Sequence, residues 1–307
     1  MKFGFVVPTK NRPREMGRLL TSLEQQSVLP TSLVIVDGGT YDLHPLLEKH
    51  QRFPIKYVRE KSSITEARNR GISELDLAIE FIGFLDDDLV FEPGALEAMM
   101  RFWKSARGCI GGAGFNIVNH PLRRPGNVLK WPFLLDCKLE GQILPSGYNT
   151  TYCPIKATQQ VSWLYGGATM WRREVLSTFK FDEWYEGYGL MEDIDFSYNV
   201  SKKFELYVVS NAAVLHLHAP GDRVPDYTFG QMQIINRYNF VKKHAELSLP
   251  LFWWASMGQA LENFVRWIVF RKKTFISKCF GNVAGMVKLL FDSRTKIFLN
   301  EKSPNSQ

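Results

Sequence analysis

The chain has 307 residues, of which 45% are hydrophobic and 22% charged, and its formal net charge is +7. This composition is typical of a globular protein with room for one large α/β domain and an appendage, and it excludes a mostly disordered or repetitive chain. The charge is uneven, because residues 246–307 hold nine Lys or Arg against four Asp or Glu. We therefore expect two segments with different partners, a catalytic domain over residues 1–245 and a basic helical tail over residues 246–307.

The cysteines and the N-terminal residues bear on the cellular compartment in which the protein is expected. The chain has no CxxC pair among its cysteines, which argues against a structural zinc site and fits a reducing environment. The cysteines are Cys109, Cys137, Cys153 and Cys279. The apolar run that follows Met1 and Lys2 is too short for the core of a signal peptide. We therefore expect a cytoplasmic protein.

Strand and helix patterns alternate through the first half of the chain. Strands are expected at residues 3–9, 32–39, 55–60 and 80–85. Helices are expected to begin at Pro13, Leu43, Ser63 and Pro93, and Ser63 forms a capping box with Glu66. This alternation predicts a mixed, mainly parallel α/β sheet flanked by helices, with its ligand site at the carboxyl ends of the strands.

Polar residues follow three of these strands directly. They are Pro8-Thr9, Asp37-Gly38-Gly39 and Asp86-Asp87-Asp88. Turn chemistry alone accounts for any one of them, but three such ends at one sheet edge favour a site. Residues 119–160 lack clear periodicity and are rich in Pro and Gly, so we expect a long excursion over the sheet that covers a binding site.

The triple aspartate is the first candidate for chemistry. In an extended segment Asp86 and Asp88 project to one side and Asp87 to the other, where it faces outward and is the most replaceable. Two carboxylates on one side make a hard oxygen site for Mn²⁺ or Mg²⁺. The alternative is an exposed acidic turn without a ligand.

A second acidic group and a histidine pair follow later in the chain. Glu192, Asp193 and Asp195 lie where a helix is expected to begin, so they either cap that helix or supply a general base. His216 and His218 share one face of an expected strand. They offer a metal ligand or a phosphate contact, or else they are structural.

Seven motifs occur in an order that resembles the family 2 glycosyltransferases of the GT-A fold, over about residues 3–245. They are VVPTKNR, VIVDGG, ITEARNRGI, FLDDDLVFEPGAL, YGGATMWRREVL, FDEWYEGYGLMEDIDFSY and AAVLHLH. The resemblance implies an inverting transfer of a sugar from a nucleotide-diphosphate donor to a saccharide hydroxyl during surface glycan assembly. A lipid-linked saccharide is one form of acceptor that it allows. It also implies a divalent cofactor, Mn²⁺ or Mg²⁺.

The resemblance assigns roles residue by residue. For the nucleotide, the matching residues are Pro8, Thr9, Arg12, Asp37, Arg68, Asn69, Asp86 and Asp87. For the metal they are Asp86, Asp88 and His216, and for catalysis they are Asp193 as the base with Glu192 beside it. For the donor or acceptor sugar they are Gly166, Gly167, Trp184, Asp195 and His218. Many family members carry an Arg beyond the second acidic group, where this chain has Tyr198 and Asn199.

Two rival functions stay open at this point. The first is a polyprenyl-phosphate sugar synthase, whose acceptor is a phosphate and needs no proton removed. The second is a catalytically silent scaffold that binds sugar nucleotides at the membrane. Nucleic acid is not expected as a partner, because the basic residues lie among aliphatic runs and no nucleic-acid module is visible.

The tail contains two amphipathic patterns. In the first, one helical face carries large apolar residues and the opposite face polar ones. The apolar face comprises Trp254, Met257, Leu261, Phe264, Val265 and Ile268, and the polar face comprises Ser256, Gln259, Asn263 and Arg266. The second pattern comprises Ile276, Phe280, Val283, Val287 and Leu290. A membrane span is not expected, so these helices either lie in a membrane interface, on the cytoplasmic face, or pack on the domain or on another subunit.

Overall fold

The structure is a computed structural model that describes residues 1–122, 130–218, 224–292 and 294–296. Its strands are β1 (Phe3–Thr9), β2 (Ser32–Asp37), β3 (Ile55–Arg59), β4 (Phe81–Leu85), β5 (Leu89–Phe91), β6 (Ile110–Ile117), β7 (Gln159–Val161), β8 (Ala168–Arg172) and β9 (Glu205–His216). Its helices are α1 (Pro13–Glu24), α2 (His44–Leu47), α3 (Ile64–Glu74), α4 (Ala95–Ser105), α5 (Arg173–Thr178), α6 (Glu192–Ser201), α7 (Asp226–Lys243), α8 (Leu249–Phe270) and α9 (Lys273–Phe291).

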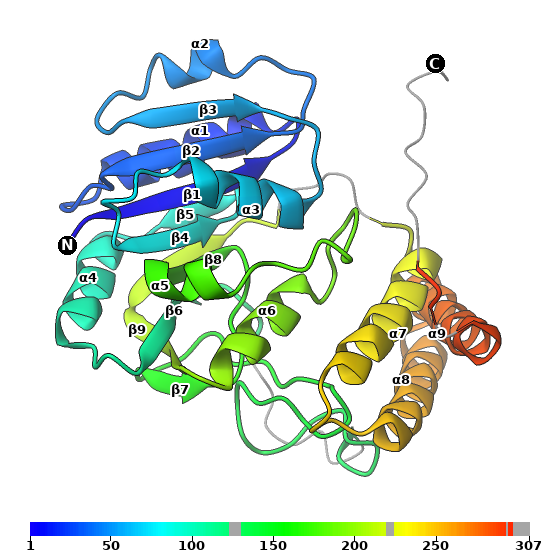
Figure 1. Ribbon diagram of the computed structural model, residues 1–307. Coiled ribbons are helices and arrows are strands. Elements are labelled where there is room, and N and C mark those ends of the chain that lie inside the picture. The colour runs from blue at the N-terminus through cyan, green and yellow to red at the C-terminus, as the bar shows by residue number, and fades with distance from the viewer. Residues whose placement is uncertain (123–129, 219–223, 293, 297–307) are drawn as a thin grey trace.

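The sheet is mixed and mainly parallel, as the sequence predicts. Its strand order is β3-β2-β1-β4-β8-β6-β9-β5, and β7 pairs with β9 outside this path. Strands β1 to β4 run parallel to one another, whereas β8 is antiparallel to both β4 and β6. Helices cover both faces, with α3 on the near face and α1 on the far face of the view in Figure 1. The carboxyl ends of β1, β2 and β4 therefore meet at one edge.

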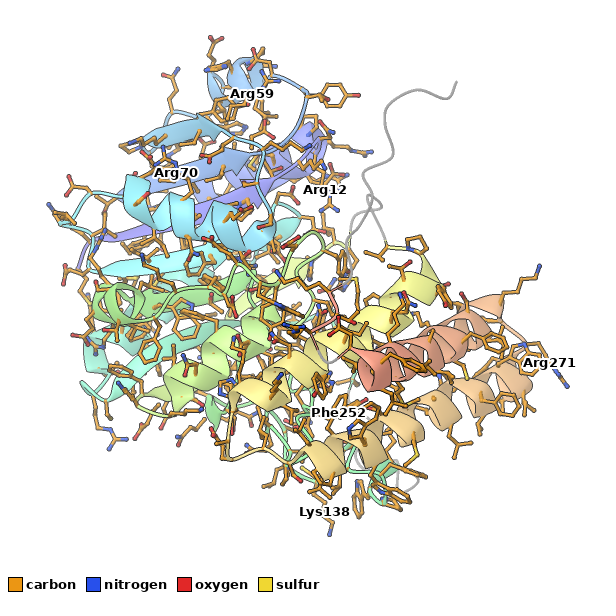
Figure 2. The ribbon with its side chains drawn as sticks, turned by 45° about the vertical axis from the view of Figure 1, so that its right-hand side comes forward. Arg12, Arg59, Arg70, Lys138, Phe252 and Arg271 are labelled. Carbon is orange, nitrogen blue, oxygen red and sulfur yellow. The ribbon has the colours of Figure 1, made fainter. Side chains whose placement is uncertain are left out.

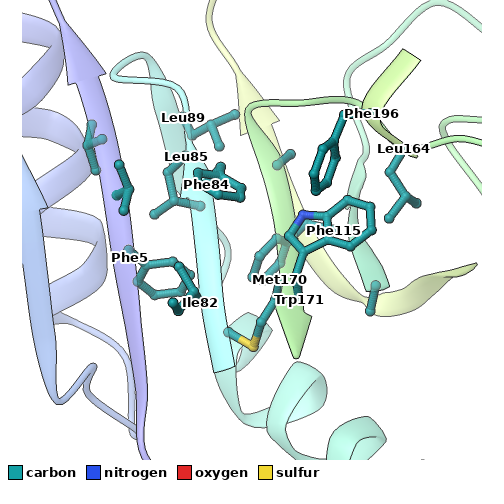
Figure 3. Packing of buried hydrophobic residues seen from close by; sticks show 14 of the residues in the cluster. Phe5, Ile82, Phe84, Leu85, Leu89, Phe115, Leu164, Met170, Trp171 and Phe196 are labelled. Atoms are coloured by element: carbon teal, nitrogen blue, oxygen red, sulfur yellow. The ribbon is translucent and has the colours of Figure 1, made fainter. Parts of the chain in front are cut away.

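The core joins the sheet to the helix that carries the second acidic group. Figure 3 shows Phe5 of β1, Phe84 of β4 and Trp171 of β8 among the buried side chains, each at most 2% exposed. The Trp171 ring lies edge-on to Phe196 of α6, with the ring centroids 5.0 Å apart. The Trp171 indole N–H donates to Thr169 Oγ1 at 2.9 Å, so its polar atom is satisfied. Burial of these rings holds α6 against the sheet.

Helices α7, α8 and α9 form a layer beside the sheet, as Figure 1 shows. Helix α9 packs along both α7 and α8. The predicted boundary between residues 245 and 246 falls between α7 and α8, inside this layer. The division into two domains stays a prediction.

The expected excursion over residues 119–160 touches both the sheet and this helical layer. On the sheet side, the Asn116 side chain of β6 donates to the Ile155 carbonyl and accepts from the Ile155 N–H, both at 3.0 Å. On the other side, the indole N–H of Trp254 in α8 donates to the Pro132 carbonyl at 2.7 Å. The described part of the excursion therefore ties α8 to the sheet.

Candidate active site

The first loop and the triple aspartate meet at the carboxyl edge of the sheet. Thr9 and Asp37, the last residues of β1 and β2, are partners in register. Thr9 Oγ1 donates to Asp87 Oδ2 at 2.6 Å, and Arg12 Nη1 donates to Asp87 Oδ1 at 3.0 Å. Figure 2 shows Arg12 at this edge of the sheet. The structure thus brings together residues 75 to 78 positions apart in the sequence.

Asp87 is the centre of that contact, and the expectation that it faces outward is wrong. Its side chain is buried, and it lies in a turn between β4 and β5, not in an extended segment. Burial raises the pKa of Asp87 to about 6, although Thr9 and Arg12 favour its carboxylate. Local alternation predicted that Asp87 diverges from its neighbours, but only the tertiary structure supplies the two donors that make its burial tolerable.

Asp86, Asp88 and His216 form the candidate metal centre. Leu89 and His216 are partners in the antiparallel pairing of β5 with β9, which places the imidazole over the turn. His216 Nε2 lies 3.0 Å from Asp88 Oδ1 and 3.9 Å from Asp86 Oδ2. Burial lowers the pKa of His216, but the hydrogen bond to Asp88 and the charge of Asp86 outweigh it, so the pKa is raised overall.

This donor set fits a divalent cation. One ligand atom from each of the three residues lies within 4.8 Å of the others. Two carboxylates with one imidazole suit Mn²⁺ and also admit Mg²⁺, which prefers oxygen ligands. The mutual repulsion of the two carboxylates gives a cation at this point a stabilising role.

Sequence reasoning missed His120, which lies beside this centre. The His120 ring stacks on the His218 ring at 5.4 Å, and the His216 and His218 ring centroids are 4.2 Å apart. Burial lowers the pKa of His120 to about 4, and the two neighbouring imidazoles add to the effect. Asn119 holds the segment in place by bonding the His216 backbone at both N–H and carbonyl. A signal existed, since Asn119 and His120 come directly after the mainly apolar run 110–118.

Arg68 is the cation that joins the two acidic groups. It extends from α3, is 2% exposed, and its Nη1 donates to Glu192 Oε1 at 2.5 Å. Its Nη2 lies 3.7 Å from Asp86 Oδ1. The guanidinium also lies over the Phe181 ring, 5.1 Å from the centroid. A buried guanidinium with carboxylates on two sides keeps both in place.

We expect the substitution Arg68→Met to lower the free energy of unfolding by about 3–5 kcal/mol, because it leaves Glu192 buried without its counter-charge. The matched control is Arg70→Met on the same helix, where the exposed ion pairs with Glu60 and Glu74 are worth about 0–1 kcal/mol. Chemical denaturation followed by circular dichroism measures both. Adding Glu192→Gln to Arg68→Met should restore part of the loss, and equal effects of the two Arg variants would contradict the burial argument.

Glu192 and Asp193 begin α6, as the sequence predicts. Burial raises the pKa of Glu192, and the charge of Arg68 opposes this. Glu192 Oε2 is buried without a hydrogen-bond partner among the described residues. Asp193 Oδ2 accepts from the Gly166 N–H at 3.1 Å, and its Oδ1 accepts from the Ile194 N–H at 2.8 Å. Burial also raises the pKa of Asp193, against the Gly166 bond and the charge of Arg68.

Gly166 and Gly167 let the loop before β8 approach both acidic groups. A Cβ atom on Gly166 would lie 2.8 Å from Asp193 Cβ and from the Arg68 guanidinium. A Cβ atom on Gly167 would lie 1.9–2.1 Å from the carboxyl group of Asp86. The Gly167 carbonyl also accepts from the Asp86 N–H at 2.8 Å. Only glycine therefore fits next to Asp86.

We expect Gly167→Ala to displace the Asp86 carboxylate and to weaken Mn²⁺ affinity at least tenfold, because a metal ligand moves. Gly108→Ala is the control, since nothing lies within 4 Å of a Cβ at that position. Isothermal titration calorimetry with Mn²⁺ measures the affinity, and a thermal scan checks that both variants fold. An unchanged Mn²⁺ affinity in Gly167→Ala would show that Asp86 is not a ligand.

Asp37 and Asn69 have neighbouring groups that hold them in place. Asp37 is buried and accepts from the Gly39 N–H and the Tyr57 hydroxyl, each at 2.7 Å. Asn69 donates to the Phe181 carbonyl at 3.0 Å and accepts from the Phe181 N–H at 3.1 Å. Asp37 thus stays at the carboxyl end of β2. Asn69 positions the backbone of Phe181, whose ring lies against the Arg68 guanidinium. The contact of Asn69 with a nucleotide stays a prediction.

Asp195 and Trp184 are placed away from the metal centre. Asp195 is buried and pairs with Lys243 and with His244, whose Nε2 lies 2.9 Å from Asp195 Oδ1. Trp184 lines a hollow against α7 with Lys296, whose ammonium lies over the indole at 5.4 Å. Both side chains therefore serve the junction between α6 and α7. Asp195 lies two positions after Asp193, about 200° around the helix, so the two carboxyl groups project from opposite sides of α6. The contact of Asp195 and Trp184 with a sugar stays a prediction.

Comparisons with known proteins identify the family. The model of the family described as "Glycosyl transferase family 2" matches residues 5–179. An uncharacterized glycosyltransferase, YwdF, of Bacillus subtilis (strain 168) is 30% identical over 103 residues, which are 33% of this chain and 38% of that protein. The "Minor teichoic acid biosynthesis protein GgaA" of the same organism is 30% identical over 109 residues, 33% of this chain and 24% of that protein. The chain thus spans well under half the length of these relatives.

Solved structures share the fold. A mannosyltransferase, PcManGT, from Pyrobaculum calidifontis in complex with GDP-Man and Mn²⁺ superposes with a TM-score of 0.57 at 13% identity, covering 95% of this chain and 88% of that one. S. aureus TarS 1-349 in complex with UDP-GlcNAc superposes with a TM-score of 0.55 at 17% identity, covering 88% of this chain and 73% of that one. At such identities the likeness concerns the GT-A type fold alone.

Proposed function

This chain belongs to glycosyl transferase family 2, and from that membership we propose that it transfers one sugar from a nucleotide-diphosphate donor to a saccharide hydroxyl with inversion. The observation that carries the proposal is the convergence of two acidic groups, the triple aspartate and Glu192-Asp193, on the buried cation of Arg68. One group suits the diphosphate end of a donor and the other suits proton transfer. Both lie at the edge of the sheet where ligands bind in open α/β folds.

In this proposal Asp193 is the general base. Its carboxylate takes the proton of the acceptor hydroxyl as that oxygen attacks the anomeric carbon. The new carbon–oxygen bond forms while the bond from the anomeric carbon to the phosphate oxygen breaks, and the leaving nucleoside diphosphate keeps the electron pair. Attack opposite the leaving group inverts the anomeric configuration.

Asp86, Asp88 and His216 would hold the divalent cation, Mn²⁺ or Mg²⁺. When bound, the cation supplies positive charge that neutralises the diphosphate. Thr9, Arg12 and Asp87 fix the turn on which Asp86 and Asp88 lie. Preorganised charge of this kind favours the charged leaving group over the intact donor.

The acceptor belongs to a cell-surface glycan in this proposal. Support comes from the relative named for minor teichoic acid biosynthesis. Nucleotide sugars are the proposed donors, which fits a protein on the cytoplasmic face of a membrane. The solved relatives are described with UDP-GlcNAc in one case and GDP-Man in the other, so they support a nucleotide sugar without singling out the base.

A calorimetric panel tests the proposal. UDP-GlcNAc, GDP-mannose and a dTDP-sugar are titrated into the protein with and without Mn²⁺, and donor hydrolysis is followed by release of the nucleoside diphosphate. We expect one donor to bind tightly only when Mn²⁺ is present and to be hydrolysed slowly without acceptor. Binding with no hydrolysis and no transfer to any saccharide would support the silent scaffold instead.

A further inference from the structure

The helices α7, α8 and α9 pack against one another through small and polar residues. Asn263 of α8 donates to Asn282 Oδ1 of α9 at 2.8 Å, and Asn282 donates to the Gly230 carbonyl of α7 at 2.8 Å. Both Asn side chains are buried. A Cβ on Gly281 would lie 2.1 Å from the Tyr227 carbonyl oxygen, so α9 approaches α7 as closely as backbones allow. Hydrogen-bonded polar groups and glycines thus lie in the interior of this layer beside buried apolar side chains such as Ile234 and Leu289.

Many large apolar side chains of α8 and α9 are exposed to solvent on the other side, although the indole of Trp254 also contacts Pro132 and Phe133. On α8 the residues that are at least 40% exposed are Trp254, Met257, Leu261, Phe264, Val265, Ile268, Val269 and Phe270. On α9 they are Phe280, Val283, Val287, Leu290 and Phe291. We call these thirteen residues the apolar face. The surface of a soluble monomeric protein rarely exposes so many large apolar side chains together, and such a face marks an interaction site.

The sequence left open a membrane interface, packing on the domain and packing on another subunit, and the exposure of the apolar face argues against packing on the domain. If the helices served mainly to pack on the domain, the apolar residues would be inside. Instead Ser256 and Asn263, from the polar face, are buried, while Leu261 and Ile268 are 48% and 44% exposed. The helices therefore offer their apolar face to a partner outside the described part of the chain.

The charge around the apolar face favours an anionic partner. The turn between α8 and α9 carries three exposed cations, Arg271, Lys272 and Lys273, and Lys288 of α9 is also exposed. Glu262, the acid within α8, is paired with Lys130 and lies 3.6 Å from Arg266. Figure 2 shows Arg271 at the end of the helical layer farthest from the sheet. A second copy of this chain would bring like charges together, whereas an anionic surface would neutralise them.

We propose that the apolar face docks in the interface of a lipid bilayer that carries anionic headgroups, with the basic turn at Arg271–Lys273 bound to lipid phosphates. None of the described helices is long and apolar enough to cross a membrane. Helices that lie in the interface have this combination of an apolar side, aromatic residues and flanking cations. Phe264 and Phe280 supply aromatic residues at the boundary.

Docking in this way would bring the carboxyl edge of the sheet toward the membrane. In Figure 1 the strands β1 to β3 point toward the side from which α7, α8 and α9 extend. This arrangement gives a lipid-linked saccharide a short path to the acidic groups, a consequence that rests on the proposed function. The docking itself does not depend on glycosyl transfer, so it is tested by binding alone.

Vesicle flotation with the full chain tests the proposal. Vesicles of phosphatidylcholine alone are compared with vesicles that contain 30% phosphatidylglycerol. We expect strong binding only to the anionic vesicles, and at least a tenfold weaker partition for Val269→Glu in α8 and for Phe280→Glu in α9. The matched control is Leu77→Glu, which changes an 86% exposed leucine at the connection between α3 and β4 and should bind like the wild type. Circular dichroism checks that all variants fold.

Two further experiments complete the test: removal of the basic residues in the turn between α8 and α9, and measurement of the molecular mass by light scattering. Replacing Arg271, Lys272 and Lys273 with Gln should lower binding to anionic vesicles at least tenfold, and high salt should have the same effect. Equal binding of Val269→Glu and Leu77→Glu would overturn the proposal. A second outcome would also overturn it: the wild type forms a stable dimer in light scattering and does not bind vesicles, and Val269→Glu dissociates that dimer. The apolar face would then be a contact between copies of the chain.

Discussion

We expect Asp88→Asn to abolish Mn²⁺ binding in calorimetry and to lower the rate of sugar transfer by about 10³-fold, because it removes a group that would anchor positive charge at the leaving diphosphate. The reason lies in the geometry of the turn. Asp88 is buried, and its carboxylate is 3.0 Å from His216 Nε2, so an amide there loses the charge that the cation needs. Calorimetry gives a readout that does not depend on turnover.

Two controls define this result. Glu48→Gln removes an exposed carboxylate after α2 and should change neither Mn²⁺ affinity nor transfer. Asp87→Asn is the sharper comparison, because Asp87 bonds Thr9 and Arg12 and lies outside the candidate metal ligands. We expect it to lower the free energy of unfolding by about 1–3 kcal/mol through the weakened contact to Arg12, with Mn²⁺ affinity largely kept. Equal losses of Mn²⁺ affinity in Asp87→Asn and Asp88→Asn would contradict the separate roles.

Asp193→Asn is the second variant with a large expected effect. We expect kcat to fall by about 10²–10⁴-fold while donor binding is unchanged, because the amide cannot accept the proton of the acceptor hydroxyl. The amide oxygen can keep only one of the two backbone N–H bonds of Asp193, so a thermal scan checks that the variant folds. The control is Asp226→Asn, another acid in the first turn of a helix, whose partner is Lys278. Rates of transfer and donor affinities by calorimetry measure both effects.

The same variant distinguishes the rival activities. A phosphate acceptor is already ionised and needs no base, so near-full activity of Asp193→Asn on a polyprenyl phosphate would support the synthase instead. A wild-type protein that binds donor but neither hydrolyses nor transfers it would support the silent scaffold.

The pH dependence of transfer provides an independent check on Asp193. The base acts as a carboxylate, and burial raises its pKa above the ordinary aspartate value. Transfer should therefore decline as the pH falls, and the decline should begin at a higher pH than for an exposed aspartate. Stopped-time assays from pH 5 to 8 measure the profile, and Asp193→Asn should flatten its acidic limb. An acidic limb that is identical in the variant would assign the titration to another group.

The sequence predicted the features that depend on neighbouring residues. The alternation of strands and helices over the first 105 residues is confirmed, and so is the capping box of Ser63 and Glu66 at the start of α3. Helix α6 begins at Glu192, as the clustered acids indicated. Each of these rests on periodicity or capping, which act within a few residues and can be read from the chain directly.

The tertiary structure decided which distant groups meet. The burial of Asp87 depends on hydrogen bonds from Thr9 and Arg12. The burial of Glu192 depends on its ion pair with Arg68, which is 124 positions away in the sequence. His120 joins the histidines because β6 and β9 are parallel neighbours, a pairing that local patterns do not encode.

The helical tail shows the same division. From sequence alone its two helices have an apolar and a polar side, because periodicity fixes which residues share a face. Which side is inside was decided by the hydrogen bonds of Asn263 and Asn282 and by the close approach at Gly281. Periodicity determines a face, but only the partners available in three dimensions determine whether that face is buried, and here they left the apolar one in solvent.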